Sequence, residues 1–240
     1  MEGITILRNL WKRIYRKLFG AYSLSSLLSK EIENEWTILD VGCGRTSSLK
    51  GVNKGSYRVG LDIYKPYISK IRGVPIHNAY VLGDARALPF KSKSFDCAVA
   101  TEILEHLDKH DGSRMVEEIE RVVKKKILMT TPNDFLPTYA GLDDNPDERH
   151  LCGYTAAELK GLGFRVWGFH GLKMLWTIKH GQSVVKLRLP KILSNLLINT
   201  TELFVYHRPS LAFQFFLIKD IDNKDKRNQT EHSKIMTNGT

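Results

Sequence analysis

Residues 36–49 read WTILDVGCGRTSSL and join an apolar run to a glycine-rich turn. The run through Val41 predicts a buried β-strand. In Gly42-Cys43-Gly44 a ligand can approach the backbone closely, because glycine has no side chain. The polar residues that follow predict a helix start, whose free N–H groups would point at that ligand. The stretch therefore predicts a ligand-binding turn at the carboxyl end of a strand.

Strands and helices alternate along the rest of the chain. Further strands are predicted by apolar runs at 57–63, 78–85, 95–101, 125–132 and 164–169, and a final buried strand is predicted over Leu211–Lys219. Between them lie helical stretches such as 112–125 and 155–163. This alternation indicates a mostly parallel α/β sheet with helices on both faces. Ligands bind such sheets beyond the carboxyl ends of the strands.

Three successive strands end in an acid. Asp40 lies at the end of the first strand, Asp62 at the end of the second, and Asp84 just after the third. One such acid would most often cap a helix, but three in a row are harder to assign to capping. An acid about 20 residues after the turn can accept both hydroxyls of a ribose. A carboxylate before the turn would repel a pyrophosphate but suits a cationic or hydroxylated ligand.

These motifs resemble, in order and spacing, those of class I S-adenosylmethionine-dependent methyltransferases, and most closely the type 11 branch. The matching stretches are ILDVGCGRTSSL, GLDIY, GDARALPF, FDCAVATEILEHL, ILMTTPN and GYTAAELKGLGFRV. The resemblance covers roughly residues 36–180. It implies a Rossmann-like, seven-stranded sheet with one antiparallel strand, the last. The family often has another glycine where this chain has Thr46, and such a turn could weaken cofactor binding.

The resemblance also implies the residues that bind S-adenosylmethionine. Asp40, Gly42, Cys43 and Gly44 would surround its methionine part, Asp62 its ribose, and Ile63, Asp84 and Ala85 its adenine, while Thr101 would face both cofactor and acceptor. An NAD-dependent dehydrogenase begins with a similar pattern. Its GxGxxG motif requires a third glycine, and position 47 is Ser47 here. The missing glycine and Asp84 therefore disfavour that alternative.

Composition limits the setting of the protein. The chain has 240 residues, 42% of them hydrophobic, and a net charge of +10, which suggests an anionic partner such as nucleic acid or a lipid surface. Its three cysteines are far apart, so neither a disulfide framework nor a cysteine zinc site is expected. We see no apolar run of the roughly 18 residues that span a bilayer, and no signal peptide. The sequence therefore predicts a cytoplasmic protein.

Both ends of the chain are predicted to lie outside the catalytic domain. Residues 1–30 are assigned to a basic amphipathic helix, 31–219 to a methyltransferase domain with an apolar C-terminal region, and 220–240 to a disordered tail. The basic helix and the apolar region 192–206 make contact with an anionic membrane plausible. Packing of that helix on its own domain is the alternative. The oligomeric state is left open.

The segment TEILEH is the candidate for chemistry. It places Glu102, Glu105 and His106 within one helical turn, and His150 follows in the loop 133–154. His106 and His150 are the candidate catalytic residues, as bases or pocket residues. The four side chains together could bind a divalent metal, and they resemble those of metal-dependent RNA 2′-O-methyltransferases. Similar segments also occur in small-molecule enzymes without metal, so no metal is assigned. A purely structural His106 is the third reading.

The sequence thus predicts an enzyme that transfers a methyl group from S-adenosylmethionine by direct displacement. The acceptor is predicted to be a small molecule, with lipid-linked and glycan-type compounds as the kinds considered and nucleic acid less favoured. Two alternatives stay open. One is a metal-dependent RNA 2′-O-methyltransferase, and the other is a binding module that has kept the cofactor site without catalysis. The intact trio of strand-end acids favours an enzyme.

Overall fold

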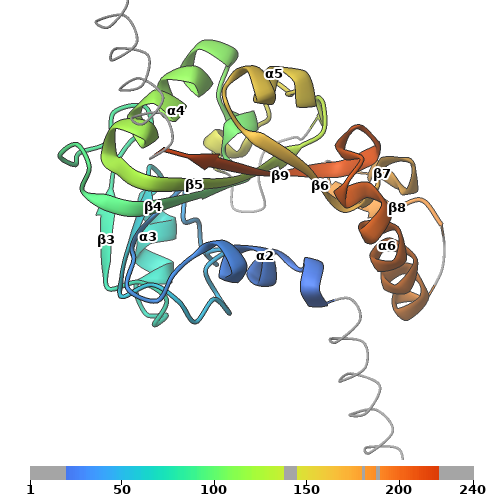
Figure 1. Cartoon of the computed structure of the whole chain (residues 1–240), viewed down its shortest axis with the longest axis horizontal. Helices are drawn as coiled ribbons and strands as arrows, with labels where there is room; N and C mark the ends of the chain where they lie inside the picture. The colour runs from blue at the N-terminus through green and yellow to red at the C-terminus, as the bar shows by residue number, and fades with distance from the viewer. Residues whose placement is uncertain (1–19, 138–144, 180–181, 188–189, 222–240) are drawn as a thin grey trace, which may run out of the picture.

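The computed structural model describes residues 20–137, 145–179, 182–187 and 190–221. Its centre is a seven-stranded sheet in the order β3-β2-β1-β4-β5-β9-β6 (Figure 1). The strands are β1 Thr37–Val41, β2 Tyr57–Asp62, β3 Ala79–Leu82, β4 Phe95–Thr101, β5 Val123–Pro132, β6 Arg165–Leu172 and β9 Ala212–Asp220. β9 runs antiparallel to both of its neighbours, and the other pairs are parallel. The predicted sheet with one antiparallel strand is confirmed.

Helices cover both faces of this sheet. α2 and α3 lie on one face, and α4 and α5 on the other (Figure 1). The bounds are α2 Leu24–Glu31, α3 Lys65–Ile71, α4 Lys109–Val122 and α5 Ala156–Gly161, with short 3-10 turns η1 Gly20–Tyr22, η2 Leu104–His106, η3 Pro146–Glu148, η4 Lys173–Leu175 and η5 Pro209–Leu211. At the β6 end of the sheet lie α6 Lys191–Tyr206 and the hairpin of β7 Trp176–Lys179 and β8 Gln182–Val185 (Figure 1).

The apolar runs form strands because both faces of the sheet are buried. In β1, Leu39 and Val41 belong to a core that includes Met115 and Ile119 of α4. Ile38 precedes Leu39 and points to the opposite face of the sheet. It belongs to a second core that includes Leu27 and Leu28 of α2. Side chains at alternate positions thus serve opposite layers. This arrangement fixes the carboxyl ends of β1, β2, β4 and β5 at one edge of the sheet.

The C-terminal region contains more structure than the sequence predicted. The predicted final strand is confirmed as β9, but the apolar region before it contains α6, which begins after Pro190. The β7–β8 hairpin was not predicted. None of the helices in the described ranges combines the length and hydropathy that crossing a bilayer requires. The predicted basic helix before residue 20 and the predicted tail after 221 lie outside the described residues, so the domain boundaries stay predictions.

Candidate functional site

The glycine turn after β1 is open toward the edge of the sheet. Gly42 and Gly44 have φ values of 66° and 57°, which favour glycine. A Cβ on Gly42 would lie 2.7 Å from Cδ1 of Ile103, whereas a Cβ on Gly44 would meet no atom within 4 Å. The Cys43 side chain is buried, and its N–H donates to the Leu61 carbonyl at 2.9 Å. The turn is therefore packed behind and open in front, as a cofactor cradle requires.

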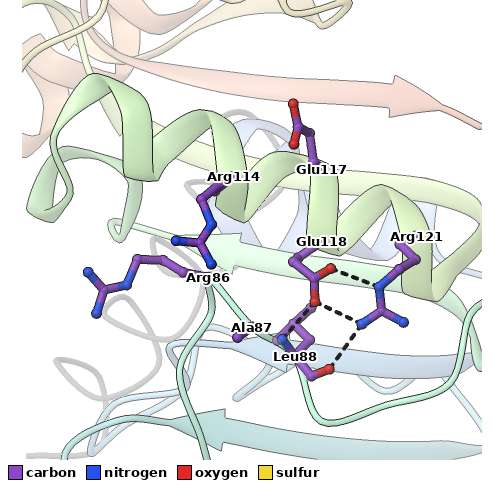
Figure 2. A pocket seen from close by; sticks show the side chains of 7 residues that line it. All are labelled: Arg86, Ala87, Leu88, Arg114, Glu117, Glu118 and Arg121. Atoms are coloured by element: carbon purple, nitrogen blue, oxygen red, sulfur yellow. Dashed lines mark hydrogen bonds and ion pairs between the residues drawn. The ribbon is translucent and has the colours of Figure 1, made fainter.

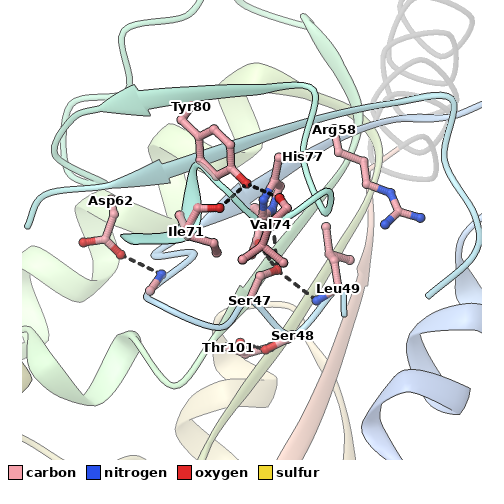
Figure 3. A network of polar contacts seen from close by, with 12 residues as sticks. Ser47, Ser48, Leu49, Arg58, Asp62, Ile71, Val74, His77, Tyr80 and Thr101 are labelled. Atoms are coloured by element: carbon pink, nitrogen blue, oxygen red, sulfur yellow. Dashed lines mark hydrogen bonds and ion pairs between the residues drawn. The ribbon is translucent and has the colours of Figure 1, made fainter. Parts of the chain in front are cut away.

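Asp62, at the end of β2, faces this turn. Its Oδ2 accepts from Gly44 N–H at 2.8 Å (Figure 3). Its Oδ1 accepts from Tyr64 N–H at 2.9 Å. Burial raises the pKa of the carboxyl group, and the two N–H donors oppose that rise. Each oxygen keeps a further lone pair that could accept from a ribose hydroxyl. The neighbouring Ile63 is exposed, so its side chain is available to a ligand.

Asp40 lies behind the turn in a buried polar network. Its Oδ2 accepts from Nε2 of His77 at 2.8 Å and from Oγ of Ser47 at 2.5 Å. Both the Asp40 and His77 side chains are almost fully buried. Figure 3 shows His77 and Ser47 in this network. Asp40 therefore contacts the turn itself, and the predicted contact with the cofactor stays a prediction. The loop before β3 gave no sequence signal that His77 would take part.

Ser47 stands where a dinucleotide-binding turn has its third glycine. Its φ of 24° is in the left-handed range, which costs a non-glycine residue about 1–3 kcal/mol. The side chain offsets that strain, because its Oγ donates to Asp40 and accepts from Leu49 N–H at 3.0 Å. Next to it, the hydroxyls of Ser48 and Thr101 are in direct contact. The predicted cofactor residue Thr101 thus lies beside the turn.

The third strand-end acid has a different partner. Asp84 forms a two-pronged ion pair with Arg86, from Nε to Oδ1 at 3.0 Å and from Nη2 to Oδ2 at 2.7 Å. These hydrogen bonds lower the pKa of Asp84. Ala85 is buried in the core, so only its backbone could face a ligand. A bound adenine would therefore share Asp84 with Arg86.

A cavity of about 450 Å³ lies beside Arg86, between the β3–β4 connection and α4 (Figure 2). Glu118 occupies its centre, accepting from Leu88 N–H at 2.8 Å and from Arg121 at 2.8 Å. Among its charged lining residues, Glu118 and Arg121 are thus paired with each other. It contains none of the predicted site residues, and we do not assign it to the site.

Two carboxyl groups lie at the other end of the same edge. Oε1 of Glu102 accepts from Thr130 at 2.8 Å, and Oε2 of Glu105 accepts from Thr131 at 3.0 Å. Oε1 of Glu105 is buried and has no hydrogen-bond partner among the described residues. Burial and the neighbouring carboxylate raise the pKa of Glu105. Glu102 is exposed to solvent, whereas the Glu105 side chain is buried.

His106 and His150, the predicted catalytic pair, are brought together. Their rings meet edge to face with centroids 4.8 Å apart. Burial lowers the pKa of His106, and burial together with His106 lowers that of His150 to about 4, so both rings are neutral at pH 7. Nδ1 of His150 lies 2.7 Å from the Leu136 carbonyl and must donate to it. The site therefore holds two neutral imidazoles side by side.

A chain of hydrogen bonds extends this edge to β6. The Gln214 amide donates to Oε2 of Glu102 at 2.8 Å, and its oxygen lies 3.1 Å from Nδ1 of His170. His170 has a φ of 66°, and the buried Glu202 of α6 accepts from the N–H groups of His170 and Gly171 at 3.0 and 2.5 Å. No sequence motif pointed to this series of hydrogen bonds, because its members come from four separate segments.

We call the turn at 42–48 with β1, β2 and β3 the cofactor side. The acceptor side comprises the Glu102–His106 segment, β5, β9, β6 and α6. Of the predicted site residues, those implied for the cofactor lie on the cofactor side or next to it, whereas His106 and His150 meet on the acceptor side. The arrangement can hold a ligand in the turn and a second molecule beside two neutral imidazoles.

Comparisons with known proteins find similarity over part of the chain. Residues 39–128 match the family model described as a methyltransferase domain. A tRNA (carboxymethyluridine(34)-5-O)-methyltransferase of Saccharomyces cerevisiae is 36% identical over 36% of this chain and 30% of that protein. The uncharacterised protein MJ1252 of Methanocaldococcus jannaschii is 32% identical over 48% of this chain and 43% of that protein. The chain thus spans less than half the length of either curated relative.

A solved structure shows the same fold over most of the chain. A SAM-dependent methyltransferase of Methanosarcina mazei superposes with a TM-score of 0.53 at 19% identity, covering 81% of this chain and 96% of that one. Residues 39–128 therefore form a methyltransferase domain, and the resemblance to class I S-adenosylmethionine-dependent methyltransferases of type 11 is confirmed.

Proposed function

We propose that the chain is a methyltransferase that moves a methyl group from S-adenosylmethionine to a hydroxyl of a small-molecule acceptor. The observation that carries this proposal is the alignment, along one edge of the sheet, of an open glycine turn with two neutral imidazoles. The methyltransferase domain supports the donor. The acceptor class and a cytoplasmic location are part of the proposal.

The residues of the cofactor side fit the donor. The open front of Gly44 gives it room, and Asp62 has lone pairs for its ribose. The Asp62 carboxylate beside the turn also suits a cationic donor, whereas Asp40 and Asp84 are bonded to His77 and Arg86. When bound, S-adenosylmethionine supplies a methyl group on a sulfonium, which leaves as a neutral thioether. The protein then needs to align the acceptor and exclude water, with no covalent step of its own.

The acceptor side provides a base for a hydroxyl acceptor. The imidazole of His150, which is neutral at pH 7, could take the hydroxyl proton as the oxygen attacks the methyl carbon. His106 packs on that ring and sets its position. Glu105 lies close enough to stabilise an imidazolium once it forms. In this proposal His106 and His150 are the catalytic residues, as the sequence predicted.

A titration with S-adenosylhomocysteine tests the proposal. The wild type should bind, and Asp62→Ala should bind about tenfold to a hundredfold more weakly, because a hydrogen bond to a charged group contributes about 1.5–3 kcal/mol. Asp134→Ala is the matched control, since Asp134 is an exposed carboxylate outside the cofactor side. No binding by the folded wild type, or equal binding by all three proteins, would rule out the proposed cofactor site.

A metal-dependent RNA 2′-O-methyltransferase is the second candidate. Glu105, His106 and His150 offer ligand atoms that all lie within 4.8 Å of one another. Oε1 of Glu105 and Nδ1 of His106 are buried without partners among the described residues. Mixed imidazole and carboxylate ligands suit Mn²⁺, Fe²⁺ or Zn²⁺. The name of the yeast relative supports an RNA acceptor.

A titration with MnCl₂ in the presence of S-adenosylhomocysteine separates the two candidates. Under the second, the wild type binds Mn²⁺, and His150→Ala loses that binding while it keeps the nucleoside. No bound Mn²⁺, together with methyl transfer that a chelator leaves unchanged, would favour the small-molecule candidate.

A further inference from the structure

The helix α6 is apolar on two opposite sides. Ile198 and Val205 are buried on the side that faces β6. On the outer side Leu193 is 49% exposed, Leu203 60% and Phe204 47%. Leu193 and Phe204 are three turns apart and so lie in one stripe, which Leu203 widens. A helix that is apolar all round normally belongs in a core or a membrane. The outer stripe therefore calls for something to cover it.

The inner side alone attaches α6 to the domain. Glu202 accepts from two N–H groups of the β6 bulge, and Oγ1 of Thr201 accepts from Leu172 N–H at 3.3 Å. The backbone of β6 approaches that of α6 so closely at Gly168 that a Cβ there would overlap the Val205 carbonyl. The outer stripe takes no part in these contacts, so the fold does not explain its composition.

The sequence on both sides of α6 is apolar, and the part that precedes it is positively charged. Met174, Leu187 and Leu211, which flank α6 in the sequence, are also exposed. Residues 173–201 contain five Lys and Arg and no acid. The Arg208 guanidinium lies over the Phe204 ring, 4.8 Å from its centroid. Exposed leucines next to cations, without acids between them, are typical of a helix that lies in a membrane interface.

We propose that the outer face of α6 docks on an anionic lipid surface. Charge complementarity selects this occupant, because a second copy would bring two acid-free faces together. Single-stranded RNA is bound mainly by aromatic stacking, whereas most of this stripe is aliphatic. Continuity adds support. The Tyr22 ring meets that of Tyr206 with centroids 5.2 Å apart, so residues 1–19, with five Lys and Arg and one acid, join the chain beside α6.

The position of α6 connects the docking face to the reaction. Figure 1 shows α6 at the β6 end of the sheet, away from β3. Through Glu202 the helix holds the His170 bulge, whose imidazole is linked by Gln214 to Glu102. Docking would thus bring the acceptor side, and not the cofactor side, close to the lipid. An acceptor carried by the membrane could then reach the two imidazoles, a step that rests on the proposed function.

Vesicle co-sedimentation of the full chain tests the docking face. The wild type should bind vesicles that contain phosphatidylcholine and phosphatidylglycerol. Its binding should be much weaker to vesicles of pure phosphatidylcholine, and much weaker to the anionic vesicles at high salt. Leu203→Gln/Phe204→Gln should lower the partition coefficient about tenfold or more, because each apolar side chain that enters the lipid contributes. Tyr57→Gln/Val74→Gln is the matched control, with side chains of 46% and 37% exposure at the start of β2 and in the α3–β3 loop, away from the carboxyl ends of the strands.

Each outcome decides the proposal. Circular dichroism and S-adenosylhomocysteine binding establish that the variants are folded. The proposal that α6 docks on lipid would be overturned if the wild type did not co-sediment with anionic vesicles. It would also be overturned if the Leu203→Gln/Phe204→Gln variant bound them as well as the control variant. Equal binding to neutral vesicles would remove the charge argument. A dimer in sedimentation equilibrium that dissociates only in the double variant would identify a second copy as the occupant. Failure here would leave nucleoside binding intact, so it is distinguishable from failure of the proposed function.

Discussion

The cofactor side and the acceptor side differ in how far apart in the sequence their hydrogen-bonded residues lie. On the cofactor side, Ser47 bonds to Asp40 seven residues away, and Gly44 to Asp62 18 residues away. On the acceptor side, Gln214 bonds to Glu102 across 112 residues, and His170 to Glu202 across 32. The cofactor side is thus built largely by a short stretch of chain, whereas the acceptor side needs segments from most of the domain. Donor binding can therefore stay constant while acceptor binding varies.

The largest expected effect comes from the close approach of β6 and α6. Gly168→Ala should lower the free energy of unfolding by about 3 kcal/mol, because the new Cβ would overlap the Val205 carbonyl and force the two backbones apart. Urea unfolding measures the change. Gly161→Ala is the control, since a Cβ there meets nothing within 4 Å and the effect should stay within about 1 kcal/mol.

The same pair of variants sharpens the comparison between the two sides. If the two sides are independent, the fraction of the Gly168→Ala variant that remains folded should bind S-adenosylhomocysteine with the same affinity as the wild type. A large loss of affinity in the folded variant would show that the acceptor side also shapes the cofactor turn.

A smaller effect is expected within the turn itself. Ser47→Ala keeps the left-handed backbone but loses the hydroxyl that bonds to Asp40, so its affinity for S-adenosylhomocysteine should fall about tenfold. Ser47→Gly also loses the hydroxyl, yet it relieves the backbone strain and should fall less. Calorimetric titration of both variants gives the order. If Ser47→Ala bound S-adenosylhomocysteine more tightly than Ser47→Gly, backbone strain at Ser47 would be unimportant for binding.

The smallest effect concerns a local signal outside both sides, at the start of α5. Thr155 and Glu158 form a capping box at the start of α5, and hydrogen bonds from Lys109 and Thr155 lower the pKa of Glu158 to about 2. The stabilisation is present above the unfolded pKa near 4.5 and is lost as the pH falls through about 2. Glu158→Gln should lower the melting temperature by about 2 °C at pH 7. The difference should shrink below about pH 4.5, and a constant difference would contradict the assigned ionisation.

Local patterns predicted the sheet because each strand carries its own signal. The run through Val41, the two turn glycines and the final strand beginning near Leu211 were each readable within about ten residues. The β7–β8 hairpin escaped prediction because its strands have four residues each. The boundaries of α6 escaped as well, since an apolar stripe on both sides of a helix hides its period.

Side-chain partners were harder to predict than elements. The sequence identified Asp40 and Asp84 as strand-end acids, but their bonds to His77 and Arg86 depend on loops whose paths no motif specifies. The meeting of His106 with His150 was anticipated from the family pattern. Gln214 and Glu202 carried no signal, because each acquires its role only when β9 and α6 pack beside β6.

The position of β9 has a consequence for the order in which the chain can be completed during synthesis. In the described sheet β6 pairs with β9 alone, and β9 lies between β6 and β5. While the ribosome has not yet released residues 212–220, β6 has no strand to join, although β1 to β5 can already pair. We therefore expect a nascent chain to acquire nucleoside binding before its acceptor edge closes, with one open strand edge on β5 that a chaperone or a neighbouring chain could occupy meanwhile.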